Sequence, residues 1–278
     1  MNKILSLIFS VALCVTLAAC SNNQAVNIDD NSENSHLPAS PTAPARVTDT
    51  PAEPDKPVDN LDDMYNAYFT VLENLIQNHI LPDGVDGGEQ LGDMAENKFA
   101  VCDVDNDGRE ELLLLYTTTY QGGWAGYVLA YDAETKKLQT ELREFTLLTF
   151  YDNGIIKAGW SHNQGLAGDF WPYSLYQYVP DSDCYVLVGM VDAWDKNYFR
   201  SETDNQNNAF PSDIDKSGTG FVYYIMEDGQ YDNTHPVDAS QYNEWVNAHI
   251  GDASKNQIQY MDLTEENISQ IQAERRER

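Results

Sequence analysis

The sequence predicts an α+β fold, mainly antiparallel β-sheet, with an amphipathic helix before the sheet and helices after it. Three patterns predict this class. Apolar residues recur at helical spacing over residues 61–80, short apolar or alternating runs separated by turns fill residues 98–232, and helical spacing returns after residue 240. We therefore expect about eight to ten strands, joined as hairpins.

The first predicted helix has Asn60 as its N-cap and the turn Pro82-Asp83-Gly84 as its stop. At the other end of the chain, residues 240–250 and 264–273 predict two helices, the second capped by Thr264. The first helix carries an apolar and aromatic stripe that is typical of core contact, formed by Leu61, Met64, Tyr65, Tyr68, Phe69, Leu72, Leu75, Ile76 and Ile80.

The N-terminus has the pattern of an export signal. Lys3 supplies a positive charge, residues 4–17 form an apolar core, and small residues precede Cys20. The segment Leu17-Ala18-Ala19-Cys20 resembles the lipobox of bacterial lipoproteins. This resemblance implies a signal peptide over residues 1–19, cleavage before Cys20, and acylation of the thiol with a fatty chain such as palmitate. A membrane-spanning helix is the alternative, but it takes about 20 apolar residues and this core is shorter.

Residues 20–58 predict a disordered tether behind the lipidated cysteine. From residue 21 to 58 there is no Phe, Trp or Tyr, and six of the eleven prolines lie in this stretch. Such a segment buries too little apolar surface to offset the entropy lost on ordering. Aromatic residues are dense from residue 59 onward, so we expect residues 59–278 to form a single globular domain.

The chain is strongly acidic. Its net charge is −29, and removal of residues 1–19 with Lys3 gives −29 − 1 = −30. A field of this sign repels phosphate backbones, so we expect no nucleic-acid partner. The acidity fits solubility at a surface, affinity for divalent cations, or both.

Cys102 and Cys184 are the cysteines of the predicted domain. Export permits a disulfide between them, but they can equally be two small buried residues. Neither the cysteines nor the histidines of this domain have the spacing of zinc ligands.

The segment Asp103-Val104-Asp105-Asn106-Asp107-Gly108-Arg109-Glu110-Glu111 has the pattern of a calcium loop. Acids at loop positions one, three and five direct carboxylates inward, and Glu111 at position nine can close the oxygen shell. Arg109 would contribute its backbone carbonyl, and Gly108 can take the positive φ that the reversal needs. An EF-hand requires Glu at position twelve, where this chain has Leu114, so we expect a strand-loop-strand site.

The loop resembles the calcium loops of FG-GAP and VCBS-type extracellular repeats, which share the pattern Asp-x-Asp-x-Asp-Gly-x-x-acid-Leu. The resemblance covers this loop and its flanking strands. It implies structural calcium, with Asp103, Asp105, Asp107 and Glu111 as side-chain ligands. The whole chain also resembles surface lipoproteins of gut-type bacteria, which implies no particular activity. A metal-free acidic turn is the alternative, but four carboxylates without a cation would repel one another.

A weaker copy of the loop begins at Asp213 and places Asp215 and Ser217 at further ligand positions. Phe221 stands where the closing acid belongs. We therefore expect a degenerate turn, with metal binding as the alternative.

His162 lies in a glycine-containing loop, residues 161–173, together with Asn163, Asp169 and Trp171. The amide and aromatic groups suit contact with a sugar or peptide. His162 acting as a base oriented by Asp169 is a second hypothesis, and a well-packed surface loop is a third. The neighbouring Gly159-Trp160-Ser161 lacks the second glycine of a nucleophile elbow, and no catalytic residue is predicted.

These patterns together predict an exported lipoprotein, held at the cell membrane or outer surface by its lipid anchor. Its calcium-stabilised domain would bind a glycan or protein ligand. The alternative is a secreted-type hydrolase of envelope or environmental glycan or peptide, and a third hypothesis is a purely structural envelope lipoprotein. A cleft that gathers His162 or two carboxylates would favour an enzyme, and an open tryptophan-lined face would favour binding.

Overall fold

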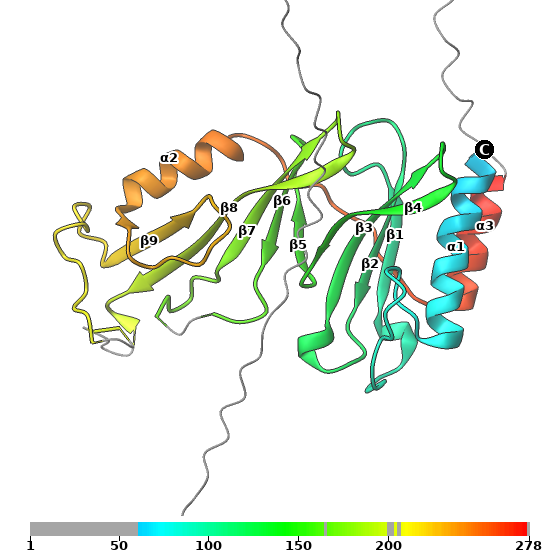
Figure 1. The fold of residues 1–278 in the computed structure, drawn as a ribbon, viewed down its shortest axis with the longest axis horizontal. Helices are drawn as coiled ribbons and strands as arrows, with labels where there is room; N and C mark the ends of the chain where they lie inside the picture. The colour runs from blue at the N-terminus through cyan, green and yellow to red at the C-terminus, as the bar shows by residue number, and fades with distance from the viewer. Residues whose placement is uncertain (1–60, 164–165, 199–202, 205–206, 277–278) are drawn as a thin grey trace, which may run out of the picture. The chain divides into compact units, whose positions relative to one another are not determined.

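The computed structural model describes residues 61–163, 166–198, 203–204 and 207–276, all within one compact unit. The predicted signal peptide, Cys20, the tether and the Asn60 cap lie outside the described residues. Within them the chain forms eleven strands and three α-helices, and both sheets are antiparallel (Figure 1). The predicted α+β class is therefore confirmed, and nine of the strands fall between residues 98 and 232, as expected.

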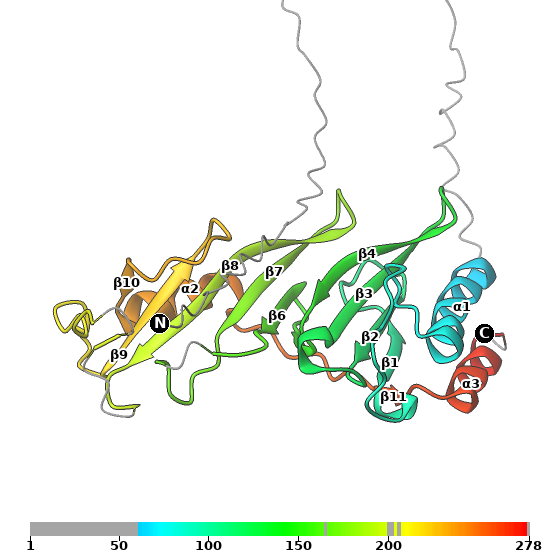
Figure 2. The same ribbon diagram turned by 60° about the horizontal axis from the view of Figure 1, so that its bottom comes forward.

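The first sheet has the strand order β11-β1-β2-β3-β4 and is a meander extended at one edge by the C-terminal part of the chain. Figure 2 shows the short β11 beside β1. The strands are β1 (Lys98–Cys102), β2 (Glu111–Tyr116), β3 (Ala125–Asp132), β4 (Lys137–Glu144) and β11 (Met261–Asp262).

The second sheet has the order β10-β9-β8-β7-β6-β5. Consecutive strands pair throughout this sheet and in the β1–β4 part of the first sheet, as the turn residues predicted. The strands are β5 (Leu147–Phe150), β6 (Ile155–Gly159), β7 (Tyr173–Val179), β8 (Cys184–Asp195), β9 (Phe221–Met226) and β10 (Pro236–Val237).

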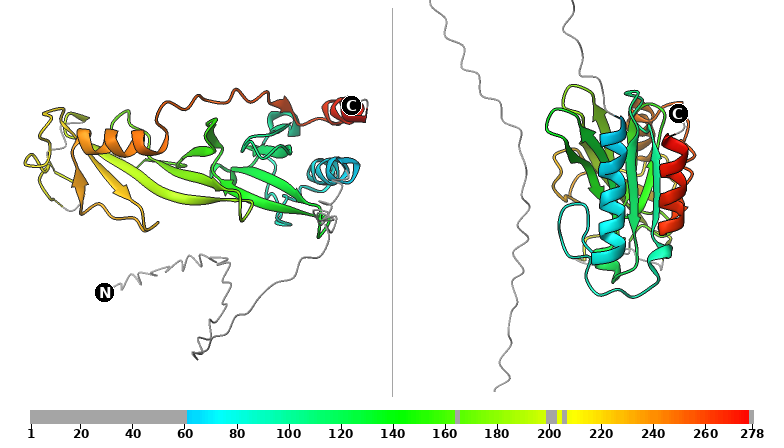
Figure 3. Two further views of the ribbon diagram at one scale, coloured as in Figure 1. Left: turned by 90° about the horizontal axis from the view of Figure 1, so that it is seen from above. Right: turned by 90° about the vertical axis from the view of Figure 1, so that its right-hand side faces the viewer.

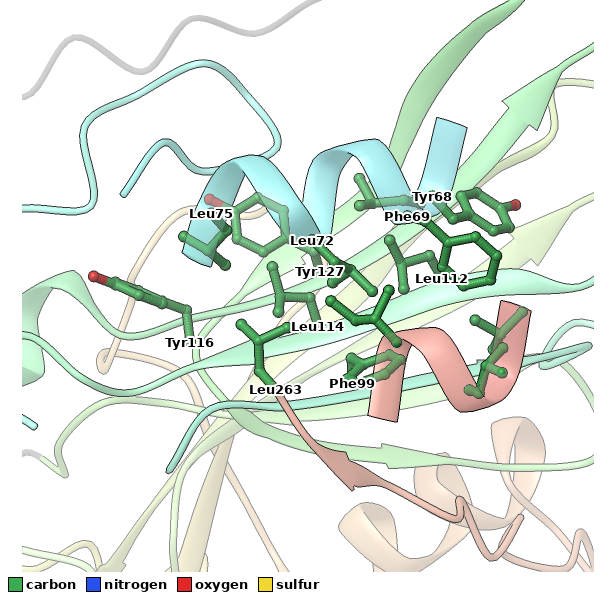
Figure 4. Packing of buried hydrophobic residues seen from close by; sticks show 14 of the residues in the cluster. Tyr68, Phe69, Leu72, Leu75, Phe99, Leu112, Leu114, Tyr116, Tyr127 and Leu263 are labelled. Atoms are coloured by element: carbon green, nitrogen blue, oxygen red, sulfur yellow. The ribbon is translucent and has the colours of Figure 1, made fainter. Parts of the chain in front are cut away.

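Helices α1 (Leu61–Asn78) and α3 (Glu265–Arg276) lie side by side against the first sheet (Figure 3). Their apolar faces meet the side chains that β2 directs to this face, as Figure 4 shows for Leu72, Leu112 and Leu114. Each of these three is fully buried, and burial of a leucine side chain contributes about 1.5–3 kcal/mol.

The ends of the helices follow local chemistry. Helix α1 stops at Asn78 because His79 has φ +57°, which no helical residue adopts. The predicted stripe was therefore wrong at Ile80, which lies beyond the helix and bridges Asp86. Thr264 caps α3, as predicted, by accepting a hydrogen bond from Asn267 N at 3.1 Å.

Helix α2 (Ala239–His249) covers one face of the second sheet, and the chain then returns to the first sheet (Figure 3). Asp238 is its N-cap and completes a capping box with Gln241. None of the helices in the described part is long and apolar enough to cross a membrane.

The two sheets share one apolar cluster, which we call the junction core. Leu113, Val128 and Leu142 of the first sheet pack there with residues of the second sheet. The acidic loop between β1 and β2 contributes Val104, so that loop begins at the junction of the sheets. The junction core consists of Ala100, Val104, Leu113, Val128, Leu142, Phe150, Ile156, Tyr178 and Tyr185.

Candidate metal centre

The β1–β2 loop is held in its curve by side-chain acceptors on backbone donors. The carboxylate of Asp103 accepts hydrogen bonds from Asn106 N at 2.7 Å and Gly108 N at 3.1 Å. Asn106 has φ +67 and Gly108 has φ +91, so the chain reverses twice through the left-handed region. The predicted positive φ of Gly108 is confirmed.

Asp103, Asp105 and Glu111 form the first acidic group, here called the loop group. Each offers a carboxylate oxygen, and the three oxygens lie within 4.8 Å of one another. Glu111 is buried at the start of β2, where its Oε2 accepts a hydrogen bond from Val104 N at 2.9 Å. Its neighbour Glu110 accepts from Tyr65 Oη at 2.7 Å, towards α1, because successive residues of an extended chain point to opposite faces.

Asp107 lies in neither acidic group, although its position in the loop predicted a ligand. Its Oδ1 accepts from Arg109 N, and its Oδ2 is paired with the Arg109 guanidinium at 2.7 Å. The same guanidinium pairs with Asp183 at 2.9 Å. The ligand role of Asp107, and that of the Arg109 carbonyl, stay predictions.

Asp105, Glu141 and Asp183 form a second group, the junction group, whose ligand atoms also lie within 4.8 Å of one another. Asp105 is thus common to both groups. Glu141 is only 5% exposed, and neither of its carboxylate oxygens has a hydrogen-bond partner within the protein. Oδ2 of Asp105 and the hydroxyl of Tyr185 are buried and unpartnered in the same way. Leaving a buried polar group unsatisfied costs about 1–3 kcal/mol.

A β-bulge explains why Glu141 points inward. Val128 pairs with Leu142 and Leu129 pairs with Thr140, so Glu141 is an extra residue on β4. Successive side chains of a regular strand point to opposite faces, so only one of two neighbours faces a given core. Because of the bulge, both Glu141 and Leu142 are buried.

Asp183 reaches the group from the turn between β7 and β8. It has φ +49, and its Oδ1 accepts a hydrogen bond from Tyr178 Oη at 2.6 Å. Its backbone carbonyl accepts from Gln139 Nε2 at 3.1 Å. The Gln139 contact fixes this turn of the second sheet against β4, and the Arg109 ion pair fixes it against the β1–β2 loop.

Burial and mutual repulsion act on these acids together. Burial, opposed by a hydrogen bond from Asp107 N and reinforced by neighbouring carboxylates, raises the pKa of Asp105 to about 6. Burial, reinforced by neighbouring carboxylates, also raises the pKa of Glu141 to about 9 and that of Glu111 to about 10. At neutral pH the two glutamates therefore hold protons unless a cation replaces them.

In the second predicted loop the buried carboxylate has hydrogen-bond partners within the protein. Asp215 is buried, and its carboxylate accepts from Thr219 N and Gly220 N, each at 2.9 Å, with Lys196 Nζ at 3.6 Å. Ser217 donates through N and Oγ to Asp238, the N-cap of α2. Asp213 is exposed, and the described residues of this loop form no acidic group of the kind found at Asp105.

The His162 loop does not assemble a catalytic pair among its described residues. His162 is exposed and its Nδ1 lies 3.0 Å from Ser161 Oγ, whereas no hydrogen bond or ion pair joins it to Asp169, which is also exposed. Trp171 is 44% exposed and donates to Trp160 O at 2.7 Å. Asn163 lies in the same loop and is half-buried.

Cys102 and Cys184 are free thiols in this structure. Burial, with help from Glu111, raises the pKa of Cys102 to about 12. It is therefore a protonated, unreactive thiol at neutral pH.

The comparisons with known proteins assign no relationship: no family model matches the chain, and neither a curated protein nor a solved structure is significantly similar to it. The residues themselves therefore carry the functional argument. They provide two acidic groups able to hold a metal ion.

Proposed function

We propose that the chain is an exported, lipid-anchored surface protein whose folded part is stabilised by calcium at the loop group. The observation that carries the calcium site is the gathering of Asp103, Asp105 and Glu111 within 4.8 Å, two of them buried, with Asp105 Oδ2 lacking any partner in the protein. Burying such charges without a cation is costly.

Calcium fits this donor set better than other common metals. The ligands are oxygens alone, supplied by a curved loop, and calcium accepts such flexible shells whereas magnesium demands a stricter octahedron. Sulfur and imidazole, which zinc prefers, are absent from both acidic groups. The surface location rests on the export pattern and on Cys20, which supports a lipid anchor as the attachment to the membrane.

A binding role for the domain agrees with its surface. Trp171 is exposed in the His162 loop and offers an aromatic face to a glycan or protein ligand. The acids that come together are mostly buried, so they suit an ion more than a polymeric substrate. No observation on the described residues favours the hydrolase over a binding domain.

Calorimetric titration of the full-length protein tests the calcium site. We expect binding of calcium with a Kd of about 10⁻⁴ to 10⁻³ M and much weaker binding of magnesium. Asp103→Asn should remove the ion of the loop group, whereas Asp213→Asn, the matched change in the second loop, should leave the titration unchanged. Absence of binding heat, with no ion retained in equilibrium dialysis, would reject the calcium site.

A further inference from the structure

We propose that the junction group of Asp105, Glu141 and Asp183 is a second divalent-cation site, adjacent to the loop group and sharing only Asp105 with it. The independent observation is Glu141. Its side chain is buried, a β-bulge turns it into the cluster, and both of its oxygens lack a partner within the protein. A carboxylate that is buried without a donor in the protein is stabilised by a bound cation.

The geometry supplies a set of oxygens for that cation. Glu141 can bind through both oxygens, Asp105 through its unpartnered Oδ2, and Asp183 through a carboxylate that Tyr178 and Arg109 hold in place. Calcium takes carboxylates in one-oxygen or two-oxygen mode and completes its shell with water. A carboxylate such as Asp105 can bridge two ions lying about 3.5–4 Å apart.

Fully ionised, the acids of the two groups can balance two divalent cations. Arg109 pairs with Asp107 and Asp183, while Asp103, Asp105, Glu111 and Glu141 make no ion pair in the described part of the chain. One divalent cation would balance two of these four carboxylates. A second divalent cation balances the remaining two.

The second ion would connect the two sheets. Glu141 comes from β4 of the first sheet, and Asp183 comes from the β7–β8 turn of the second. The ion would thus reinforce a junction that the apolar cluster and the Arg109 bridge already form. This site goes beyond the proposed loop site and is tested separately from it.

Equilibrium dialysis of the full-length protein against calcium measures the number of ions bound at saturation. We expect two per chain for the wild type. Glu141→Gln and Asp183→Asn should each reduce the number to one, and Asp103→Asn should do the same by removing the other ion. The exposed acids Glu134 and Asp181 supply matched controls, since Glu134→Gln and Asp181→Asn should each retain two ions.

Asp183→Asn keeps the test valid if Glu141→Gln does not fold, because Asp183 is only half-buried. A wild-type count of one that both Glu141→Gln and Asp183→Asn leave unchanged would overturn the junction site. So would two ions retained by both Glu141→Gln and Asp183→Asn. If the wild type binds one ion that Asp103→Asn loses and Glu141→Gln keeps, the loop site is supported and the junction site is refuted. If Glu141→Gln loses that ion and Asp103→Asn keeps it, the junction site alone is supported.

Discussion

At Glu141 a buried carboxyl lowers the stability of the ion-free fold and provides oxygens for the proposed cation. Both of its oxygens are unpartnered, and its pKa is raised to about 9, mainly by burial. A buried polar group without a partner costs about 1–3 kcal/mol. An apolar side chain of similar size avoids that cost but cannot bind a cation.

We therefore predict opposite effects for Glu141→Leu in the two conditions. In chelator the free energy of unfolding should increase by about 1–3 kcal/mol, because the unsatisfied carboxyl is gone. In calcium the variant should lose about half of the calcium-dependent stabilisation of the wild type, because the loop group still binds its ion. Urea unfolding measures the free energy of unfolding in chelator and in calcium, with Glu134→Gln as an exposed control. If Glu141→Leu were destabilised in chelator, the Glu141 carboxyl would have hydrogen-bond partners in solution and the prediction would be wrong.

The raised pKa values of three acids predict how calcium dependence varies with pH. In chelator the folded protein keeps protons on Asp105, Glu141 and Glu111 that the unfolded chain releases near its ordinary pKa of about 4. The folded state then binds more protons, so stability falls as pH rises, by up to about 1.4 kcal/mol per pH unit for each proton. For Asp105 this fall in stability with pH ends above its pKa of about 6, because its proton has then left the folded state too.

Calcium binds the ionised carboxylates, so its stabilising effect should grow across roughly pH 5 to pH 8. The measurement is the difference in unfolding free energy between saturating calcium and chelator at each pH, in which titrations elsewhere in the chain cancel. An equal calcium increment at both ends of that range would contradict the account.

At the scale of secondary-structure elements, spacing predicted most of the fold. The stripe of α1, the Thr264 cap and the hairpin strands all follow from local periodicity and turn chemistry. The candidate site was predicted only in part. Three loop acids gather as expected, but Glu141 depends on a bulge that breaks alternation, and Asp183 reaches the cluster only through packing of one sheet on another.

The two similar loops differ in how their acids are satisfied. Asp215 accepts two backbone N–H groups and faces Lys196, so its charge is balanced within the protein. Asp105 has a buried oxygen with no partner. The sequence separates the loops by Phe221, which stands where Glu111 closes the first loop. The backbone donors and Lys196 that balance Asp215 are seen only in the structure.

This contrast predicts that Asp215→Ala destabilises the fold equally with and without calcium. The expected loss is about 1–3 kcal/mol, since buried N–H donors lose their acceptor. Asp213→Ala, at an exposed position of the same loop, should change stability by less than about 0.5 kcal/mol. Urea unfolding in calcium and in chelator checks both variants; a calcium-dependent loss for Asp215→Ala would assign a metal to this loop.

For the molecule as a whole, the proposed lipid anchor predicts where the protein is found. Cys20→Ala removes the thiol that the lipobox pattern assigns to acylation, so the variant should leave the membrane fraction. Cell fractionation and mass spectrometry of the intact protein check this, with Cys184→Ala as a cysteine control. Wild-type protein without lipid mass in the soluble fraction would refute the anchor.

We propose that an acidic centre at the loop and sheet junction binds calcium and thereby stabilises the fold. Asp105 belongs to both acidic groups, so Asp105→Asn is the most direct probe of it. With calcium at about 1 mM and a Kd of about 10⁻⁴ M, each occupied site adds about 1.4 kcal/mol. For a domain of this size, that corresponds to a rise of a few degrees in Tm.

The deciding measurement is a thermal melt of wild type, Asp105→Asn and Asp213→Asn, each in calcium and in chelator. We expect a higher Tm in calcium than in chelator for wild type and Asp213→Asn. For Asp105→Asn the melts in calcium and in chelator should coincide. Coincident curves for the wild type, or an undiminished calcium shift in Asp105→Asn, would contradict it.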